Sequence, residues 1–404
     1  MKIYKKMLMG LCVILAYFSL GSGQIIDTSP PDHPVKLFFI HHSVGEGWLR
    51  KDIGNLGNEL QNNNYYVNDI SYGWDVQYNT NIGDSTDIGQ WYTWFLDTSV
   101  QSNGEKKCDN VCNALFNSNY HYSYYDNILS DPGGENEIIM FKSCYPNSKI
   151  LNDNGTTIDD LINASAPSDG YTLNNVKLLY NYLLNQFMKL HPEKMFVIIT
   201  SPPIVHYYSN PTEGQNAREL TNWLVNDFLA DNQWVNKNVY IFNYFNVLTG
   251  ENNHHRVVDG QIEHVVNDEY NFAYYKKGEY DSHPNSIGQQ KATQEFIPLL
   301  NAYYHLFEEY KSSILGIKEK TIIPDDYKIE VYPNPFNPVT TITFAPYFIN
   351  GKYNITNIEG KLIEQGTIAS QTIVWDAENY PSGTYIITAI KNEIIKSRKV
   401  VLLK

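Results

Sequence analysis

The sequence is poor in cysteine and in positive charge. Four cysteines occur in 404 residues, and 30 lysines and arginines stand against 44 aspartates and glutamates, which gives a formal net charge of −14. No basic stripe runs along the chain, so nucleic-acid binding is not expected. Cys12 lies in the first 23 residues. Of the others, Cys108 and Cys112 either pair as a disulfide or are ordinary small residues in a loop and core, with Cys144 buried and free.

Long apolar runs are also missing, except at the N-terminus. Basic residues at the start precede the apolar run 7–20 and then Gly21-Ser22-Gly23. This pattern predicts a secretory signal peptide over residues 1–23. The run is too short to span a bilayer comfortably, so no stable membrane span is expected. Residues 24–35, rich in Pro and Asp, are predicted to form a linker.

Apolar segments with strand and helix character alternate over about 270 residues. The expected buried strands are 36–40, 65–72, 137–141, 195–200 and 239–245, and the expected helices are 173–190, 217–229 and 286–306. This alternation predicts an α/β domain with a mostly parallel sheet. Polar clusters follow three of the strands, at 41–43, 143–147 and 201–203, where chemistry gathers in such sheets.

The chain changes character after about residue 318. Residues 309–327 are predicted to be a linker, and residues 328–404 consist of short β-type segments separated by turn signals. Such a pattern is typical of a small β-sandwich.

One set of residues is suited to acyl-transfer chemistry. Such chemistry needs a nucleophile, a base and hydrogen-bond donors for the developing oxyanion. Ser43 stands at the end of the first strand, and His283 precedes the last helix, from where a base can reach back to that strand. Asp281 is placed to orient the imidazole, and Asn147 to donate its side-chain amide to the oxyanion. The spacing alone also allows each residue a capping or turn role.

Residues 36–308 resemble the SGNH, or GDSL-like, hydrolase superfamily of esterases. "FIHHSVG" corresponds to the serine block, "KSCYPNS" to the asparagine block, and "YDSHPNSIGQQKA" to the final histidine block. The resemblance implies a flavodoxin-like three-layer α/β/α fold. It also implies a serine esterase that works through an acyl-enzyme and needs no metal or organic cofactor.

The same resemblance assigns roles to individual positions. It implies Ser43 as nucleophile, His283 as base and Asp281 as third member. The backbone N–H of Ser43, the side chain of Asn147 and a glycine after the second strand would bind the oxyanion. Gly73 is the expected glycine, with Gly83 or Gly89 as alternatives. Two departures stand out: His41-His42 replaces the usual Gly-Asp, and Tyr280 takes the usual place of the aspartate.

The expected substrate is an acylated polysaccharide or another ester. The residues expected to contact it are His42, Trp74, Trp91, Trp94, His254 and His255. The rings of the three tryptophans either form a sugar platform or pack the long insertion between about residues 73 and 134.

Two alternatives stay open. The first is a catalytically inactive SGNH-fold protein that binds carbohydrate or mediates cell-surface adhesion. The His41-His42 replacement and the spacing of Asp281 support this alternative. The second is a metal hydrolase that uses His254, His255 and His264 with Asp259 or Glu263. Their spacing matches no strong zinc signature, so a solvated loop without metal is expected there.

The C-terminal segment resembles the sorting domains of the type IX secretion system and the related FlgD-like Ig domain. "VYPNPFNPVTTITF", "NIEGKLI", "YPSGTYIITA" and "SRKVVLLK" carry this resemblance. It implies that the type IX secretion machinery is a partner. The expected location is outside the bacterial cell or on its outer-membrane surface.

Overall fold

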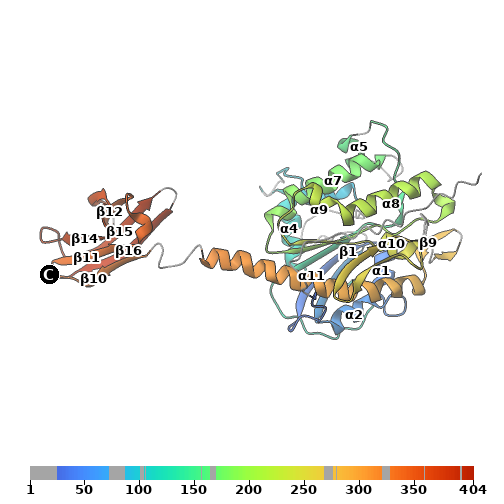
Figure 1. Ribbon diagram of the computed structural model, residues 1–404, viewed down its shortest axis with the longest axis horizontal. Helices are drawn as coiled ribbons and strands as arrows, with labels where there is room; N and C mark the ends of the chain where they lie inside the picture. Colours follow the sequence, from blue (N-terminus) through green and yellow to red (C-terminus); the bar gives the residue numbers. More distant parts are fainter. Residues whose placement is uncertain are drawn as a thin grey trace, which may run out of the picture. The chain divides into compact units, whose positions relative to one another are not determined.

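The structure, a computed structural model, divides into two compact units between Lys311 and Ser312 (Figure 1). We call them the α/β unit and the β unit. The described residues are 25–71, 87–100, 104, 106–155, 157–163, 170–267, 276–278, 280–320, 328–358, 360–391 and 394–404. The predicted signal peptide at residues 1–23 lies outside them.

A five-stranded parallel sheet forms the centre of the α/β unit (Figure 1). Its strand order is β2-β1-β3-β4-β5. Its strands are β1 Val35–His41, β2 Tyr65–Ser71, β3 Ile138–Lys142, β4 Met195–Ile199 and β5 Val239–Phe242. Nearly every strand residue is buried, which is why the sequence shows continuous apolar runs there. The order is that of flavodoxin-like sheets, and the predicted α/β class is confirmed.

Helices cover both faces of this sheet. Alternate strand residues point to opposite faces, so Phe38 and Ile40 belong to one core and Leu37 and Phe39 to the other. The first core is covered by α3 Gln90–Phe95, α4 Lys107–Asn117, α5 Ile158–Ile162, α7 Leu173–Gln186 and α8 Pro211–Asn226 with α9 Phe228–Asp231. The second is covered by α1 Ser43–Leu49, α2 Leu56–Asn62, α10 Tyr244–Thr249 and α11 Ser286–Lys320 (Figure 1).

Short elements connect these layers. They are the 3₁₀ turns η2 Tyr145–Ser148, η3 Met188–Leu190 and η4 His206–Tyr208, and the hairpin strands β6 His254–Val258, β7 Gln261–Val265, β8 Lys276–Gly278 and β9 Asp281–Pro284. Strand β9 leads directly into α11, so the predicted base and the last helix are one continuous stretch of chain.

Both predicted linkers are more structured than expected. In the first, Ile26 N donates to Gly260 O (3.1 Å) and Asn301 Nδ2 donates to Thr28 O (2.9 Å), so its described part packs on the α/β unit. The second is helical as far as Lys320, because α11 continues past its expected end at residue 306. Lys311 Nζ anchors this extension through ion pairs to Glu137 (2.9 Å) and to a neighbouring glutamate.

The β unit consists of two antiparallel sheets around one core. The sheets have the orders β10-β11-β14 and β13-β12-β15-β16. The strands are β10 Ile329–Tyr332, β11 Val339–Phe344, β12 Lys352–Asn357, β13 Leu362–Thr367, β14 Thr372–Asp376, β15 Gly383–Lys391 and β16 Ile394–Leu402, with the 3₁₀ turn η5 Pro346–Phe348. Phe348, Ile355 and Trp375 lie in the shared core. The predicted all-β C-terminal part is confirmed.

Two of the tryptophans predicted as a sugar platform are core residues instead. Trp91 and Trp94 are 0% and 1% exposed and lie on α3. The Trp91 ring packs edge to face against Phe141 and Tyr180, with ring centroids 4.9 and 5.8 Å apart. Neither ring is open to a ligand, because α3 turns this side toward the sheet. Trp74 lies outside the described residues.

The cysteines among the described residues are free thiols. Cys108 and Cys112 lie one turn apart on α4 without a disulfide, and Cys144 is buried. Burial raises the pKa of the Cys112 thiol to about 12, with smaller effects from Cys108 and Asp109.

Trp91→Ala is expected to lower the free energy of unfolding by about 3–5 kcal/mol, because it removes a fully buried ring from the first core. Urea unfolding followed by circular dichroism measures the change. Tyr124→Ala, at a ring that is 76% exposed, is the matched control and should leave the unfolding free energy nearly unchanged. Equal stability of the two variants would contradict the packing role of Trp91.

Candidate functional site

Ser43 is placed by the junction of the central strand β1 with α1. His41 ends the strand, His42 is the N-cap, and Ser43 is the first helical residue. The His42 carbonyl accepts hydrogen bonds from Gly45 N (2.7 Å) and Glu46 N (3.0 Å), which begin the helix. The serine hydroxyl therefore stands at the carboxyl edge of the parallel sheet, where ligands bind in open α/β folds.

A chain of hydrogen bonds joins the three residues predicted for acyl transfer. Ser43 Oγ lies 2.8 Å from His283 Nε2, and His283 Nδ1 lies 2.6 Å from Asp281 Oδ1. Asp281 Oδ1 also accepts the backbone N–H of His283 (2.9 Å), so one carboxylate fixes both the ring and the main chain. The His283 and Asp281 side chains are 28% and 41% exposed, so solvent reaches them. Although Asp281 stands only two residues before the histidine, the extended backbone of β9 brings it to the ring.

Two further side chains surround this chain of bonds and were not expected from the sequence. Cys144 Sγ lies 3.8 Å from Ser43 Oγ. The Tyr145 ring packs edge to face against the His283 ring, with centroids 5.3 Å apart. Both residues follow β3 in the "KSCYPNS" block. Their position just before Asn147 was the available signal.

Burial lowers the pKa values of two titratable groups next to Ser43, His42 and Lys142. Burial, helped by the charges of Lys142 and His41, lowers the pKa of His42 to about 3, so this imidazole is neutral near pH 7. His42 is the half-buried N-cap of α1, next to Ser43, and its predicted contact with substrate stays a prediction. Lys142 is fully buried, and burial lowers the pKa of its ammonium group to about 8. Its Nζ donates to Ser143 O (2.9 Å).

Asn147 holds the chain that leads into α3. Its Oδ1 accepts Ile88 N (3.0 Å), and its Nδ2 donates to Asp87 Oδ1. Gly89 N donates to Tyr171 Oη (2.8 Å), so this glycine amide is already engaged and does not serve as the alternative oxyanion donor. Gly73 and Gly83 lie outside the described residues.

The histidine-dense hairpin β6–β7 is used for packing. His254 Nδ1 lies 2.8 Å from Glu295 Oε1 on α11. His255 Nδ1 accepts Asn243 N (3.0 Å), and His264 Nε2 accepts Asn243 Nδ2 (3.1 Å). Glu295 and Asn243 thus bind the rings of His254 and His255, and the substrate role expected for these histidines stays a prediction. Within the ranges that the structure describes, no three His, Cys, Asp or Glu side chains come together as a metal site.

Exposed aromatic rings lie beside Asp281 instead. Tyr280 precedes Asp281 and is 60% exposed, as is Tyr207 on η4. Their ring centroids are 4.4 Å apart in an edge-to-face contact, and Tyr208 packs on Tyr207 at 4.9 Å. Ser282 Oγ accepts Val205 N (3.1 Å) and so ties η4 to β9. We call Tyr207, Tyr208 and Tyr280 the tyrosine cluster. Sequence reasoning missed it because its members are 72 residues apart, from Tyr208 to Tyr280.

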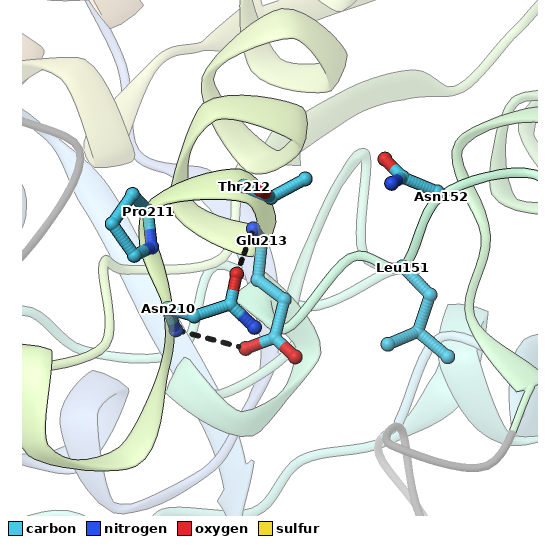
Figure 2. Close-up of a pocket in the computed structure, with 6 residues that line it drawn as sticks. All are labelled: Leu151, Asn152, Asn210, Pro211, Thr212 and Glu213. Atoms are coloured by element: carbon cyan, nitrogen blue, oxygen red, sulfur yellow. Dashed lines mark hydrogen bonds between the residues drawn. The ribbon is translucent and has the colours of Figure 1, made fainter.

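A cavity of about 520 Å³ opens two residues further along the chain from Tyr208, at the start of α8. It is lined by Leu151, Asn152, Asn210, Pro211, Thr212 and Glu213 (Figure 2). Asn210 Oδ1 accepts Glu213 N (3.0 Å), and Glu213 Oε2 accepts Asn210 N (3.1 Å), as the dashed lines in Figure 2 show. In this capping box the backbone N–H groups of Asn210 and Glu213 are already hydrogen-bonded within the helix start.

Comparison with known proteins identifies the C-terminal segment. Residues 330–403 match the secretion system C-terminal sorting domain. A domain of this kind indicates secretion to the cell surface or beyond. No curated protein matches the chain. No helix among the residues described here is long and apolar enough to cross a bilayer.

Several solved structures resemble parts of the chain. A family two carbohydrate esterase from Clostridium thermocellum is 12% identical over 71% of this chain and 67% of that one, with a TM-score of 0.31. The lipopolysaccharide acetyltransferase periplasmic domain from Salmonella ser. Paratyphi A is 11% identical over 66% and 84%, with a TM-score of 0.30. PorZ of Porphyromonas gingivalis, a surface component of the type-IX secretion system, is 20% identical over 20% of this chain and 12% of that one, with a TM-score of 0.19.

The half-buried His264 on β7 predicts how stability depends on pH. Burial and the charge of Arg218 lower the pKa of His264 to about 4, whereas an unfolded histidine has a pKa of about 6.5. Because the unfolded chain binds the proton more tightly, stability falls as the pH drops from about 6.5 toward 4. At about pH 4.5 the loss from His264 alone is expected to be about 2–3 kcal/mol.

His264→Gln removes this proton linkage. Its stability deficit relative to wild type should therefore shrink as the pH falls from neutrality, which urea unfolding at several pH values measures. Val265→Ala changes the next residue without removing a titratable group, so its deficit should stay constant. A His264→Gln deficit that does not change with pH would show that this imidazole is not buried in its neutral form.

Proposed function

We propose that the chain is an exported serine ester hydrolase. The observation that supports this is the continuous chain of hydrogen bonds from Ser43 Oγ through His283 to Asp281. A nucleophile bonded to a base, which a third group orients, is the arrangement of acyl-transfer catalysis. The sorting domain at residues 330–403 supports export, with the type IX secretion machinery as partner.

The proposed reaction has two halves. Ser43 Oγ attacks the ester carbonyl carbon while His283 Nε2 takes the hydroxyl proton. The Nδ1–H of His283 donates to Asp281, which keeps the ring in the tautomer whose Nε2 accepts and stabilises the imidazolium that forms. His283 then protonates the alkoxide leaving group, which departs. Water, deprotonated by the same nitrogen, attacks the acyl-enzyme, and Ser43 is restored when the acid leaves.

The proposed oxyanion donors include the backbone N–H of Ser43. Among the described residues this N–H has no hydrogen-bond acceptor, so it is available to the tetrahedral intermediate. The bonds of Asn147 to Asp87 and Ile88 give this side chain a role in holding the neighbouring loop. Its remaining amide hydrogen is the proposed second donor.

For the substrate we propose an O-acylated carbohydrate. The tyrosine cluster supports this, because exposed rings with a polar tip suit the apolar faces and hydroxyls of sugars. Tyr280 is adjacent to Asp281, so a sugar on this ring would present its acyl group near the reacting serine. The cluster takes the place of the tryptophan platform expected from the sequence.

Ser43→Ala and His283→Ala are expected to lower kcat for a short-chain chromogenic ester by on the order of a thousandfold, because each removes one half of the nucleophile–base pair. Hydrolysis by the purified mature protein measures this. Ser312→Ala, at an exposed serine on α11, is the matched control and should keep full activity. A fluorophosphonate probe should label the wild type and not Ser43→Ala. If Ser43→Ala hydrolyses the ester as fast as the wild type, Ser43 is not the nucleophile.

Tyr207→Ala and Tyr280→Ala are expected to raise KM for an acetylated polysaccharide by about tenfold, equivalent to about 1.4 kcal/mol of binding. The activity on the small chromogenic ester should stay within about twofold, since that substrate has no sugar to stack. Tyr124→Ala, at an exposed ring that is not a member of the cluster, is the control. Equal losses on both substrates would argue for a structural role of the cluster and against sugar binding.

A further inference from the structure

A second histidine–aspartate pair lies next to the proposed nucleophile and takes no part in the bond chain from Ser43 to Asp281. His41 and Asp69 are both 0% exposed, at the ends of the neighbouring strands β1 and β2. His41 Nε2 lies 3.0 Å from Asp69 Oδ2. On the other side of the ring, His41 Nδ1 lies 2.9 Å from the carbonyl oxygen of His42. Ser123 Oγ lies 3.4 Å from the same Nε2, so each ring nitrogen faces oxygen atoms.

The partners of Asp69 indicate its charge. Tyr122 N (3.0 Å), Ser123 N (2.9 Å) and Tyr125 Oη (2.9 Å) donate to the carboxyl group, in addition to His41. Burial raises the pKa of Asp69. The hydrogen bond and charge of His41 lower it, as do the hydrogen bonds from Ser123 and Tyr125. The lowering effects are larger, so the pKa of Asp69 lies below its usual value. Asp69 is therefore an ionised carboxylate that only accepts hydrogen bonds.

The charge of His41 follows from its two acceptors. A carbonyl oxygen and a carboxylate can only accept, so both ring nitrogens must carry hydrogen to make these bonds. A neutral imidazole has a single N–H and would leave one nitrogen lone pair facing an oxygen. We propose that His41 is a buried imidazolium ion paired with Asp69, and that this ion pair positions Ser43 for ester hydrolysis. The second part rests on the proposed function.

The pair acts on Ser43 through the first turn of α1. The His42 carbonyl that accepts His41 Nδ1–H is the same oxygen that accepts Gly45 N and Glu46 N. A Cβ on residue 45 would lie 2.7 Å from His41 Cγ, closer than real contacts allow, so glycine lets the turn rest directly on the ring. The imidazolium thus packs against the first turn of α1, in which Ser43 is the first residue.

The surroundings of the ion pair make a buried charge tolerable. A buried ion pair is stable only when its remaining donors and acceptors have hydrogen-bond partners, as those of His41 and Asp69 do. The titratable groups nearby are the neutral His42 next to the ring, Tyr125 and His121 on the Asp69 side, and Lys142, whose charge acts on His42. Burial lowers the pKa of His121, which does not compete with His41 for the role of cation.

Nitrogen-15 NMR of the full chain, labelled at the histidine rings, tests the charge directly. At about pH 7.5 an unperturbed histidine is mostly neutral, so two protonated nitrogens at His41 are diagnostic. The His41→Gln variant assigns the signal, and the buried His255 is the internal reference, since burial lowers its pKa well below the usual value and keeps it neutral. In Asp69→Asn the His41 signal should become neutral. A neutral His41 in the wild type at this pH overturns the proposal.

Kinetics test the positioning role. Asp69→Asn is expected to lower kcat per folded molecule by about tenfold or more while KM changes less than about twofold, because the serine is misplaced but the substrate surface is intact. Loss of folded protein with unchanged kcat would assign the pair a structural role and refute positioning.

The two proposals fail in different ways. If the wild type hydrolyses no ester and Ser43 resists the fluorophosphonate, the positioning role falls together with the proposed function, while the NMR result still decides the ion pair. If the wild type is active and Asp69→Asn retains its kcat, the proposed function stands and the positioning role is wrong. Tyr125→Phe, which removes one donor to Asp69 and no charge, is the control and should keep His41 protonated.

Discussion

The parallel pairing of β1 with β2 on one side and β3 on the other is the constraint on which the rest of the α/β unit depends. It brings three strand ends to one edge of the sheet. Ser43 follows the first, Asp69 lies near the end of the second, and Cys144 follows the third. A shift of one residue in either pairing would turn these side chains to the opposite face, where the other core lies. The buried apolar strand residues hold the register.

Features written into local sequence were predictable. The strands were visible as apolar runs because a parallel sheet is buried on both faces. Ser43 and His283 were predicted from their positions at a strand end and before a helix, and the structure places their side chains 2.8 Å apart. The unusual spacing of Asp281 was harder to judge, since its reach depends on the extended backbone of β9. The catalytic roles themselves stay predictions.

Features that depend on contacts between distant segments were not predictable. An aromatic-rich stretch gives no sign of which rings face the core, so Trp91 was taken for a ligand-binding residue although α3 buries it. The partner of His255 was not predictable for the same reason, because Asn243 comes from a different element. The tyrosine cluster and the partners of Asp69 need the folded chain to become neighbours. Their residue types alone are compatible with any exposed loop.

The contact between His41 and Gly45 limits which substitutions this chain tolerates. The ring needs the carboxylate at position 69, and the helix turn needs glycine at position 45 as long as the ring is there. Loss of His41 or of Asp69 leaves a buried charge without its partner, and a side chain at position 45 clashes with the ring. Positions 41, 45 and 69 therefore form one epistatic unit, in which the effect of changing one residue depends on the other two.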